Sequence, residues 1–304
     1  MKEQLYILFC ESPINPNKVD EDFEDQLNSA KEAGFVPLLF NMEDLLNPER
    51  NKHATKRIQV RNEPVKILYR GWMLTPDQYT SLYKNLSSKN YILINTPDEY
   101  RNCHYLPDSL KFIESKTPKT VFEKYDNEYS MDKLLEKTKI FGQNPVIIKD
   151  YVKSEKHHWE SACFVKNASD TSVLRQAIQK LIELRGNNLN EGIIVREFIE
   201  LNKLTFHSKS GMPLTEEYRL FFCHGKLIEV YDYWEEGEYK QAKPNTAAFE
   251  EIAGHVESNF FSMDIARQKD GKFIIIELGD GQVAGLPDSA DKHLFYRKLL
   301  TCLY

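Results

Sequence analysis

The sequence predicts an α/β unit followed by an α+β region. In roughly the first 110 residues, short apolar runs alternate with amphipathic segments, which is typical of a parallel sheet whose strands are joined by helices. Beyond this unit the pattern changes to paired apolar runs around one long amphipathic segment. The polar, proline-bearing stretch 116–120 separates the two patterns and is the expected domain boundary.

Composition limits the class of protein. The chain has 304 residues, 41% hydrophobic and 28% charged, which suits about two globular domains. It has no apolar run of 18 residues and no signal-peptide pattern, so we expect a cytoplasmic protein without a membrane partner. A net charge of −6 disfavours nucleic acid as a partner, because phosphate binding uses clustered Lys and Arg. Five dispersed cysteines favour reduced thiols over disulfides or zinc.

The N-terminal elements follow in β-α-β order. Residues 5–9 form a continuously apolar run, typical of a strand buried on both faces. Residues 20–33 place apolar side chains at helical spacing, with acidic residues at the start and Gly34 just past the end, and 36–40 is the next strand. This order predicts a small parallel sheet with a right-handed crossover. The other elements expected here are a strand at 65–69, a helix at about 75–86 and a strand at 91–94.

The second region begins with strand pairs and a helix. Residues 172–185 carry an amphipathic stripe that Asp170 opens and Gly186 closes. His224-Gly225-Lys226 lies between two apolar runs and is typical of an antiparallel hairpin. The other elements expected here are strands at 146–149 and 192–199 and a closing helix at 288–303.

The stretch 262–282 is the most informative. Asp264 ends one short apolar run, Asp270-Gly271 supplies a two-residue hairpin turn, and residues 273–276 form a second run that ends in Glu277. In such a hairpin Asp264 and Glu277 face each other. Two nearby carboxylates repel unless a proton or cation lies between them, and Mg²⁺ takes such ligands together with substrate phosphates. A nucleotide–metal site is one interpretation, and a surface hairpin with acidic ends is the other.

Several motifs occur in a fixed order along the last two thirds of the chain. They are Lys149 at a strand end, Val-Arg-Glu-Phe-Ile-Glu at 195–200, Glu-Tyr-Arg at 217–219, and then Asp264 and Glu277. In this order, and in the segments 69–72, 145–152 and 276–282, the chain resembles the ATP-grasp superfamily, most of all its R2K clade. The resemblance implies a Rossmann-like pre-ATP-grasp domain at 1–115, followed by two ATP-grasp subdomains at 116–195 and 196–304 that hold ATP between them.

The resemblance also implies an activity. Members commonly use Mg²⁺ and ATP to activate a carboxylate as an acyl phosphate, and an amine then displaces the phosphate to form an amide. The implied partners are therefore ATP, Mg²⁺ and small-molecule or peptide carboxylates and amines. A small-molecule kinase with the same grip on ATP is an alternative, and a non-catalytic nucleotide-binding interaction module is another.

The matched positions imply contacts with ATP. Lys149 would reach the α-phosphate and adenine region, although a strand-end lysine that merely reaches solvent is the alternative. The phosphate-covering loop 153–159 lacks the usual glycines, so side chains would replace backbone donors there. The other implied contacts are Lys124 as an earlier phosphate lysine, with Lys116 or Lys119 as competitors; Lys153, Ser154, Lys156 or His157 in the loop; and Glu197, Phe198, Ile199 and Glu200 in the hinge that reads adenine and ribose.

Arg219 and Lys149 are the predicted catalytic residues. Apolar neighbours would bury the stem of Arg219, and its planar fork suits a phosphate or carboxylate. In the family, an arginine on this strand faces the transferred phosphate or the tetrahedral intermediate. An ion pair with Glu217, two residues away on the same strand face, is the alternative.

Asp264 and Glu277 match the magnesium ligands of the family. Many members carry Asn two residues after the glutamate, whereas this chain has Gly279, so Asp280 or Gln282 would supply a third ligand. The substrate candidates lie elsewhere in the chain. Arg70 and Trp72 follow a buried strand, where ligands of α/β sheets commonly bind, and Gln282 is a further candidate.

Overall fold

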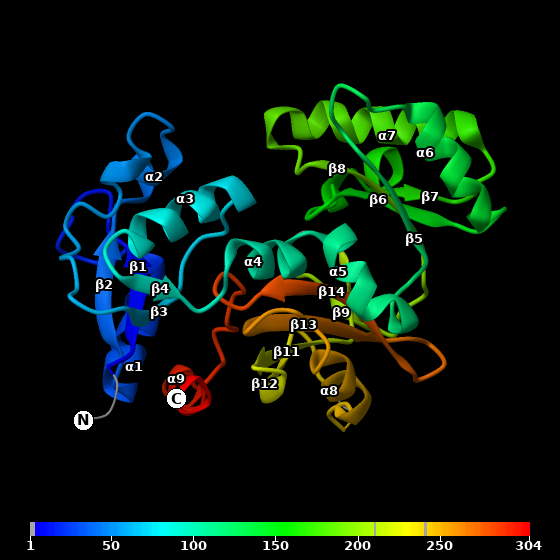
Figure 1. Cartoon of the computed structure of the whole chain (residues 1–304). Coiled ribbons are helices and arrows are strands. Elements are labelled where there is room, and N and C mark those ends of the chain that lie inside the picture. The colour runs from blue at the N-terminus through cyan, green and yellow to red at the C-terminus, as the bar shows by residue number, and fades with distance from the viewer. Residues whose placement is uncertain (1–3, 210, 240–241) are drawn as a thin grey trace.

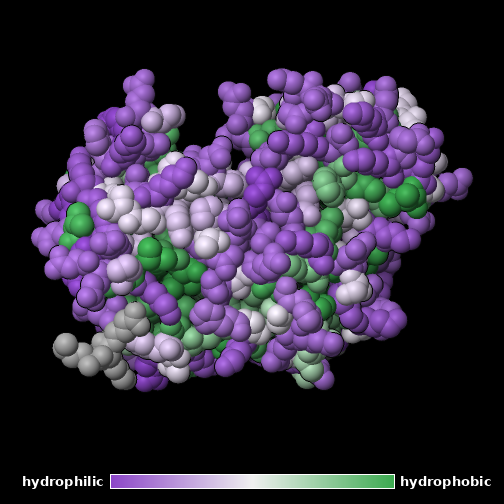
Figure 2. All heavy atoms as spheres, in the orientation of Figure 1, coloured by the Kyte–Doolittle hydropathy of each residue, from purple (hydrophilic) through white to green (hydrophobic). Residues whose placement is uncertain are grey.

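The computed structural model describes residues 4–209, 211–239 and 242–304. These residues form layered α/β units around three hydrophobic clusters, with a lobe at each side of a central sheet (Figure 1). Polar side chains cover most of the face drawn in Figure 2, and apolar side chains appear on it in small groups. None of the helices in the described residues is long and apolar enough to span a membrane.

The N-terminal unit contains a parallel sheet in the order β2-β1-β3-β4. Gly34 ends the first helix in a left-handed conformation with φ of 112°, and Thr75 forms a capping box with Gln78 at the start of the third. The elements are β1 (Tyr6–Cys10), α1 (Glu24–Ala33), β2 (Val36–Phe40), α2 (Met42–Leu46), β3 (Val65–Tyr69), α3 (Pro76–Ser87) and β4 (Tyr91–Leu93).

Two short helices, α4 (Pro97–His104) and α5 (Leu106–Ile113), connect this unit to the rest of the chain. Figure 1 shows them lying along the central sheet, close to its last strand. The C-terminal helix α9 (Lys292–Leu303) returns to pack against α1, so both ends of the chain contribute to the N-terminal unit. This helix begins later than the predicted residue 288, because the Asp291 side chain caps it by accepting a hydrogen bond from Leu294 N.

The following lobe, at the upper right of Figure 1, contains an antiparallel sheet in the order β5-β8-β6-β7. Leu174, Ile178 and Leu181 on its long helix pack against Ile193 and Val195 of the sheet, which explains the amphipathic stripe in the sequence. The elements are β5 (Thr120–Lys124), α6 (Met131–Thr138), β6 (Val146–Asp150), β7 (Phe164–Val165), α7 (Thr171–Arg185) and β8 (Gly192–Glu197).

The central sheet is antiparallel in the order β12-β11-β13-β14. His224 and Gly225 both have positive φ, 48° and 72°, as a tight turn between β11 and β12 requires. The elements are the small hairpin β9 (Lys203–Phe206) and β10 (Pro213–Thr215), then β11 (Glu217–Cys223), β12 (Lys226–Asp232), α8 (Ala247–Ala253), β13 (Phe260–Arg267) and β14 (Phe273–Asp280).

Two further predicted details are wrong. The hairpin between β13 and β14 closes through Gln268 N and Lys272 O at 2.8 Å, so its loop has three residues rather than the two-residue Asp270-Gly271 turn. Gly271 takes the left-handed position at the end of this loop, with φ of 86°. Strand β8 ends at Glu197 rather than Ile199, and the chain leaves the sheet there.

Candidate active site

The site is built on the face-to-face pair that the hairpin pattern predicted. Asp264 on β13 and Glu277 on β14 are register partners, so their side chains lie on the same face of the central sheet. Asp264 is buried, and Glu277 keeps about a third of its side chain exposed. The structure therefore places two carboxylates side by side at the mouth of a cavity.

Arg219 holds Asp264 from the neighbouring strand β11. Its Nε donates to Oδ1 at 2.8 Å and its Nη2 to Oδ2 at 2.7 Å, and its guanidinium lies 4.8 Å from the centre of the Tyr233 ring. Burial opposes the charged guanidinium, but the charge of Asp264 raises the pKa of Arg219 above its ordinary value. The predicted alternative partner, Glu217, instead accepts hydrogen bonds from Thr215 and Trp234.

Lys149 holds Glu277 from the opposite sheet. Lys149 lies on β6, is only 8% exposed, and its Nζ lies 2.9 Å from Glu277 Oε2. Burial acts to raise the pKa of Glu277, but the charge and hydrogen bond of Lys149, together with the charges of Lys156 and Arg196, lower that pKa below its ordinary value. The lysine does not simply reach solvent, because the ion pair bridges the two sheets.

The glycine-free loop 153–159 brings a further cation to this place. Lys156 Nζ lies 5.9 Å from the centre of the Trp234 ring, across the site. Its positive charge acts to lower the pKa values of both Asp264 and Glu277. Ser154, in the same loop, interacts with the Cys163 thiol.

The predicted hinge segment follows β8. Phe198 N donates to Pro145 O at 3.0 Å, so this amide is already bonded within the chain. The Phe198 ring contacts Phe164 and Trp159 edge-on, at 5.0 Å and 6.3 Å between ring centres. Trp159 and Phe164 stack at 5.3 Å and 6°, and form a flat aromatic surface that the sequence analysis missed.

Four other hinge and phosphate candidates lie at the edge of this arrangement. Glu197 and Ile199 flank Phe198 and are partly exposed. Glu200 is exposed and paired with Lys269 at 2.6 Å. Lys124 is also exposed, and its Nζ lies 3.5 Å from Glu191, so the structure does not pair it with either site carboxylate.

Asp280 and Gln282 are directed into the protein core. Asp280 Oδ2 accepts from Asn95 Nδ2 at 2.6 Å, and Oδ1 accepts from Gln282 N at 2.9 Å. Gln282 Oε1 accepts from Tyr69 N at 3.1 Å, and its Nε2 donates to the Tyr79 hydroxyl at 2.8 Å. No group of three His, Cys, Asp or Glu side chains suited to a metal occurs in the parts of the chain that the structure describes. The structure therefore does not bring either residue to Asp264 and Glu277 as a third ligand.

Gly279 explains this departure from the family pattern. A Cβ at this position would lie 2.8 Å from Ser262 Oγ, closer than real Cβ atoms approach. Ser262 is the register partner of Gly279 and therefore shares its face of the sheet. The serine hydroxyl thus fills the space that an asparagine side chain at position 279 would need. This relation follows from the strand register and not from the sequence spacing.

Arg70 has a structural role rather than the predicted contact with substrate. Its side chain is 1% exposed, and Nη1 donates to the carbonyls of Gly281 at 2.6 Å and Ala284 at 3.0 Å. Nη2 donates to Gln26 Oε1 at 2.8 Å. Trp72 is 46% exposed and donates to Asp20 Oδ2 at 3.2 Å. Arg70 therefore clamps the segment after β14 to the N-terminal sheet, and Trp72 does not line the cavity.

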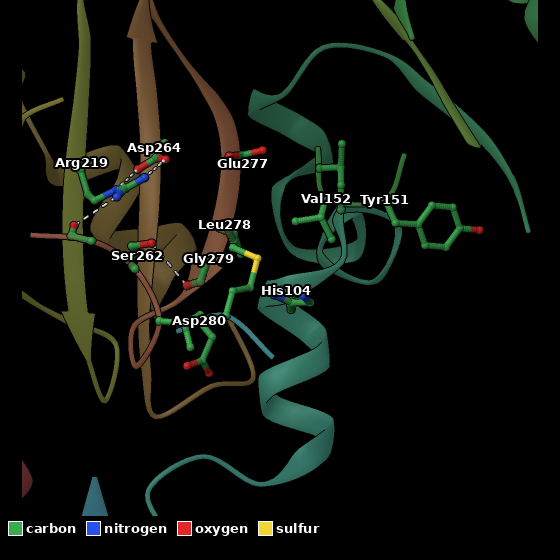
Figure 3. A pocket seen from close by; sticks show the side chains of 15 residues that line it. His104, Tyr151, Val152, Arg219, Ser262, Asp264, Glu277, Leu278, Gly279 and Asp280 are labelled. Atoms are coloured by element: carbon green, nitrogen blue, oxygen red, sulfur yellow. Dashed lines mark hydrogen bonds and ion pairs between the residues drawn. The ribbon is translucent and has the colours of Figure 1, made fainter. Parts of the chain in front are cut away.

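The cavity beside the carboxylate pair has a volume of about 150 Å³. It lies between β13–β14 on one side and the α4–α5 connection on the other, and Figure 3 shows His104 across the cavity from the strand carrying Glu277. Its polar lining is Arg219, Ser262, Asp264, Glu277, Asp280 and His104. The sequence analysis did not identify His104, because no motif marks it and only the fold brings α4 to this sheet.

The family model for the ATP-grasp domain of R2K clade family 3 matches residues 140–299. No curated protein sequence matches the chain.

Solved structures match over the whole chain at low identity. D-cycloserine synthetase DcsG is 11% identical with a TM-score of 0.60, covering 99% of this chain and 100% of that one. The ATP-grasp ligase PsnB, complexed with a phosphomimetic variant of its minimal precursor, Mg and ADP, is 11% identical with a TM-score of 0.59, and all of both chains is covered. D-alanyl-alanine synthetase A from Vibrio cholerae is 12% identical with a TM-score of 0.53, covering 100% and 99%. At these identities the likeness is one of fold.

Proposed function

Because the chain belongs to the R2K clade of the ATP-grasp superfamily, whose enzymes use ATP and Mg²⁺, we propose that it is a ligase joining a carboxylate to an amine. The carboxylate attacks the γ-phosphorus of ATP, giving an acyl phosphate and ADP. The amine nitrogen then bonds to the acyl carbon as the C–O bond to phosphate breaks, giving an amide and free phosphate. The observation that carries the proposal is the register pair Asp264 and Glu277, each bound by a cation from a different strand.

The donor set at this pair fits Mg²⁺. Two carboxylates on one sheet face are the oxygen ligands that this cation takes together with substrate phosphates. Asp264 and Glu277 would hold the ion, and both now lie against positive charge, from Arg219 and Lys149. Bound there, Mg²⁺ would offset the negative charge of the phosphate oxygens and so assist attack at the γ-phosphorus and departure of ADP.

The cations around the pair supply the rest of the electrostatics. The Arg219 fork and the Lys149 ammonium are fixed donors in a largely buried place, where they stabilise developing negative charge more strongly than in water. Lys156 adds a third positive charge from the loop that crosses the site. In the proposed reaction Arg219 and Lys149 transfer part of their bonding from the two carboxylates to the phosphates of ATP.

The adenine is proposed to bind near the hinge. Trp159, Phe164 and Phe198 provide apolar surface for a planar base, and the neighbouring carboxylates Glu197 and Glu200 are candidates for the ribose hydroxyls. We assign residues 1–115 to a Rossmann-like pre-ATP-grasp domain, and 116–195 and 196–304 to the two subdomains that hold the nucleotide. The parallel sheet and the two four-stranded antiparallel sheets of the described residues support this division.

Substrates of two kinds are compatible with the fold. The similar structures include a D-cycloserine synthetase, a D-alanyl-alanine synthetase and a ligase complexed with a precursor peptide. We therefore propose a small-molecule or peptide carboxylate and an amine as the substrates.

The test is the product of ATP turnover. Purified protein with Mg²⁺ and ATP is incubated with pooled amino acids and small polyamines, or without them, and ADP, AMP and free phosphate are resolved. ADP with equal free phosphate that appears only with the pool supports the ligase, and dividing the pool identifies the substrates. ADP without free phosphate indicates a kinase, and AMP contradicts the proposed chemistry.

A further inference from the structure

His104 is a buried imidazole without a hydrogen-bond partner in the described part of the chain. It ends α4, is 6% exposed and lines the cavity. Its ring stacks on Tyr100 at 5.0 Å and 27° and lies 5.2 Å from the Tyr105 ring. These contacts satisfy the ring faces and leave both nitrogens unbonded. A neutral imidazole has one donor and one acceptor nitrogen, so His104 can bond to a ligand in the cavity that it lines.

The charged side chains around the cavity already have partners or proposed roles. Three carboxylates line it, from Asp264, Glu277 and Asp280, whereas Arg219 is the one arginine or lysine among the lining residues in the described chain. Asp264 already occupies two donors of that guanidinium. In the proposed reaction Mg²⁺ and the phosphates engage Asp264, Glu277 and Arg219, so His104 is left to bond a second ligand in this cavity.

The apolar lining residues limit the size and polarity of the ligand. Met73, Leu106, Val152, Leu278 and Val283 are apolar. A cavity of about 150 Å³ holds the volume of roughly five water molecules. The space is therefore suited to a small and mostly apolar group that carries one nitrogen donor.

We propose that this cavity is the acceptor site and that His104 accepts a hydrogen bond from the nitrogen of a small, largely apolar primary amine. The inference rests on the proposed ligase function and names its acceptor class. Burial lowers the pKa of His104 to about 4, so the ring is neutral near pH 7 and keeps one nitrogen lone pair. His104 lines the same cavity as the carboxylate pair, so the bound nitrogen would lie in the space where the activated carboxylate is proposed to form.

Two substitutions separate hydrogen bonding from packing. His104→Phe keeps an aromatic ring against Tyr100 but removes the acceptor, whereas His104→Gln loses the ring and keeps a carbonyl acceptor. With an amine from the pooled screen, we expect His104→Phe to raise KM for the amine at least tenfold and to change KM for ATP less than twofold. His104→Gln should raise KM for the amine less, and the exposed control His255→Gln should resemble wild type. Wild-type kinetics in His104→Phe, or a smaller defect in it than in His104→Gln, would overturn the proposal.

A binding measurement decides the question without turnover. Protein labelled with ¹³C in its histidine rings is titrated with propylamine or alaninamide in the presence of Mg²⁺ and ADP, and propanol is the neutral control. We expect the His104 resonance, assigned by its loss in His104→Gln, to shift saturably with the amines and not with propanol. No saturable shift, or an equal shift with propanol, overturns the amine assignment. If the pooled screen gives no ADP, the ligase proposal fails by itself and the titration still tests His104.

Discussion

Arg219 and Asp264 are register partners on adjacent strands, and two parallel hydrogen bonds of 2.8 Å and 2.7 Å join them. Glu277 is the register partner of Asp264 on the other side, and Lys149 binds it from the opposite sheet. Cations and carboxylates therefore alternate across the site. Burial raises the pKa of Asp264 although the Arg219 charge opposes it, whereas Lys149 and the nearby cations lower the pKa of Glu277.

Removing either carboxylate charge should abolish turnover. Asp264→Asn and Glu277→Gln replace charged oxygen ligands with neutral amides, which bind Mg²⁺ weakly. We expect ADP release to fall at least 100-fold in each variant, with circular dichroism unchanged and a modest loss of thermal stability. Asp270→Asn, in the exposed loop of the same hairpin, is the control and should keep wild-type activity. Wild-type turnover in either site variant would remove the metal assignment.

The arginine fork has a matched control on the neighbouring strand. Arg219→Lys should lower kcat more than nucleotide affinity, because a lysine cannot reproduce the bidentate contact with a transferring group. Arg267→Lys removes a similar guanidinium, which binds Glu216 at 2.8 Å and lies 4.4 Å from the Phe273 ring. We expect this control to lose stability without a comparable loss of kcat. If both variants keep kcat, Arg219 acts only in the ion pair.

Asp280 should make stability depend on pH. Burial outweighs three donated hydrogen bonds and raises the pKa of Asp280 from 3.8 to about 7. A raised pKa means that the folded protein binds the proton more tightly, so this stabilisation is complete below pH 3.8 and is lost as pH rises towards 7. We expect the free energy of unfolding to fall by up to about 1.4 kcal/mol per pH unit in this window from this group.

Denaturant titrations between pH 4 and 8 measure that slope. Asp280→Asn should remove the contribution of this group to the slope. The amide opposite Asn95 Nδ2 can change the free energy of unfolding, but by the same amount at every pH. The exposed Asp98→Asn serves as the control and should retain the wild-type slope. Identical slopes in wild type and Asp280→Asn would show that this carboxyl is ionised throughout the range.

The predicted ATP-grasp fold is confirmed, and local patterns explain why it was predictable. Gly34 and Asp170 end or begin helices by capping, which depends on neighbouring residues alone. The pairing of Asp264 with Glu277 was predictable for the same reason, because one short hairpin connects their strands. Contacts inside one hairpin or helix can therefore be predicted from the local sequence.

The errors concern contacts between distant segments. Arg70 was assigned to substrate because it follows a buried strand, but its partners Gly281 and Ala284 lie more than 200 residues away. Asp280 likewise meets Asn95 from another unit. Residue type and spacing do not reveal whether a charged side chain faces a cavity or the core, since that depends on how the units pack.

Lys156 lies in the loop 153–159, which lacks glycine. Lys156 reaches across the site towards Trp234 and acts on the pKa values of both carboxylates, so its charge is available to phosphates in the absence of a backbone cradle. Lys156→Ala should raise KM for ATP about tenfold, equivalent to about 1.4 kcal/mol, and Lys156→Arg should restore most of the affinity. The exposed Lys166→Ala is the control. The defect should shrink in high salt, because ions screen a partly exposed charge. An unchanged KM in Lys156→Ala would leave the loop without a phosphate role and return that task to Lys149 and Arg219.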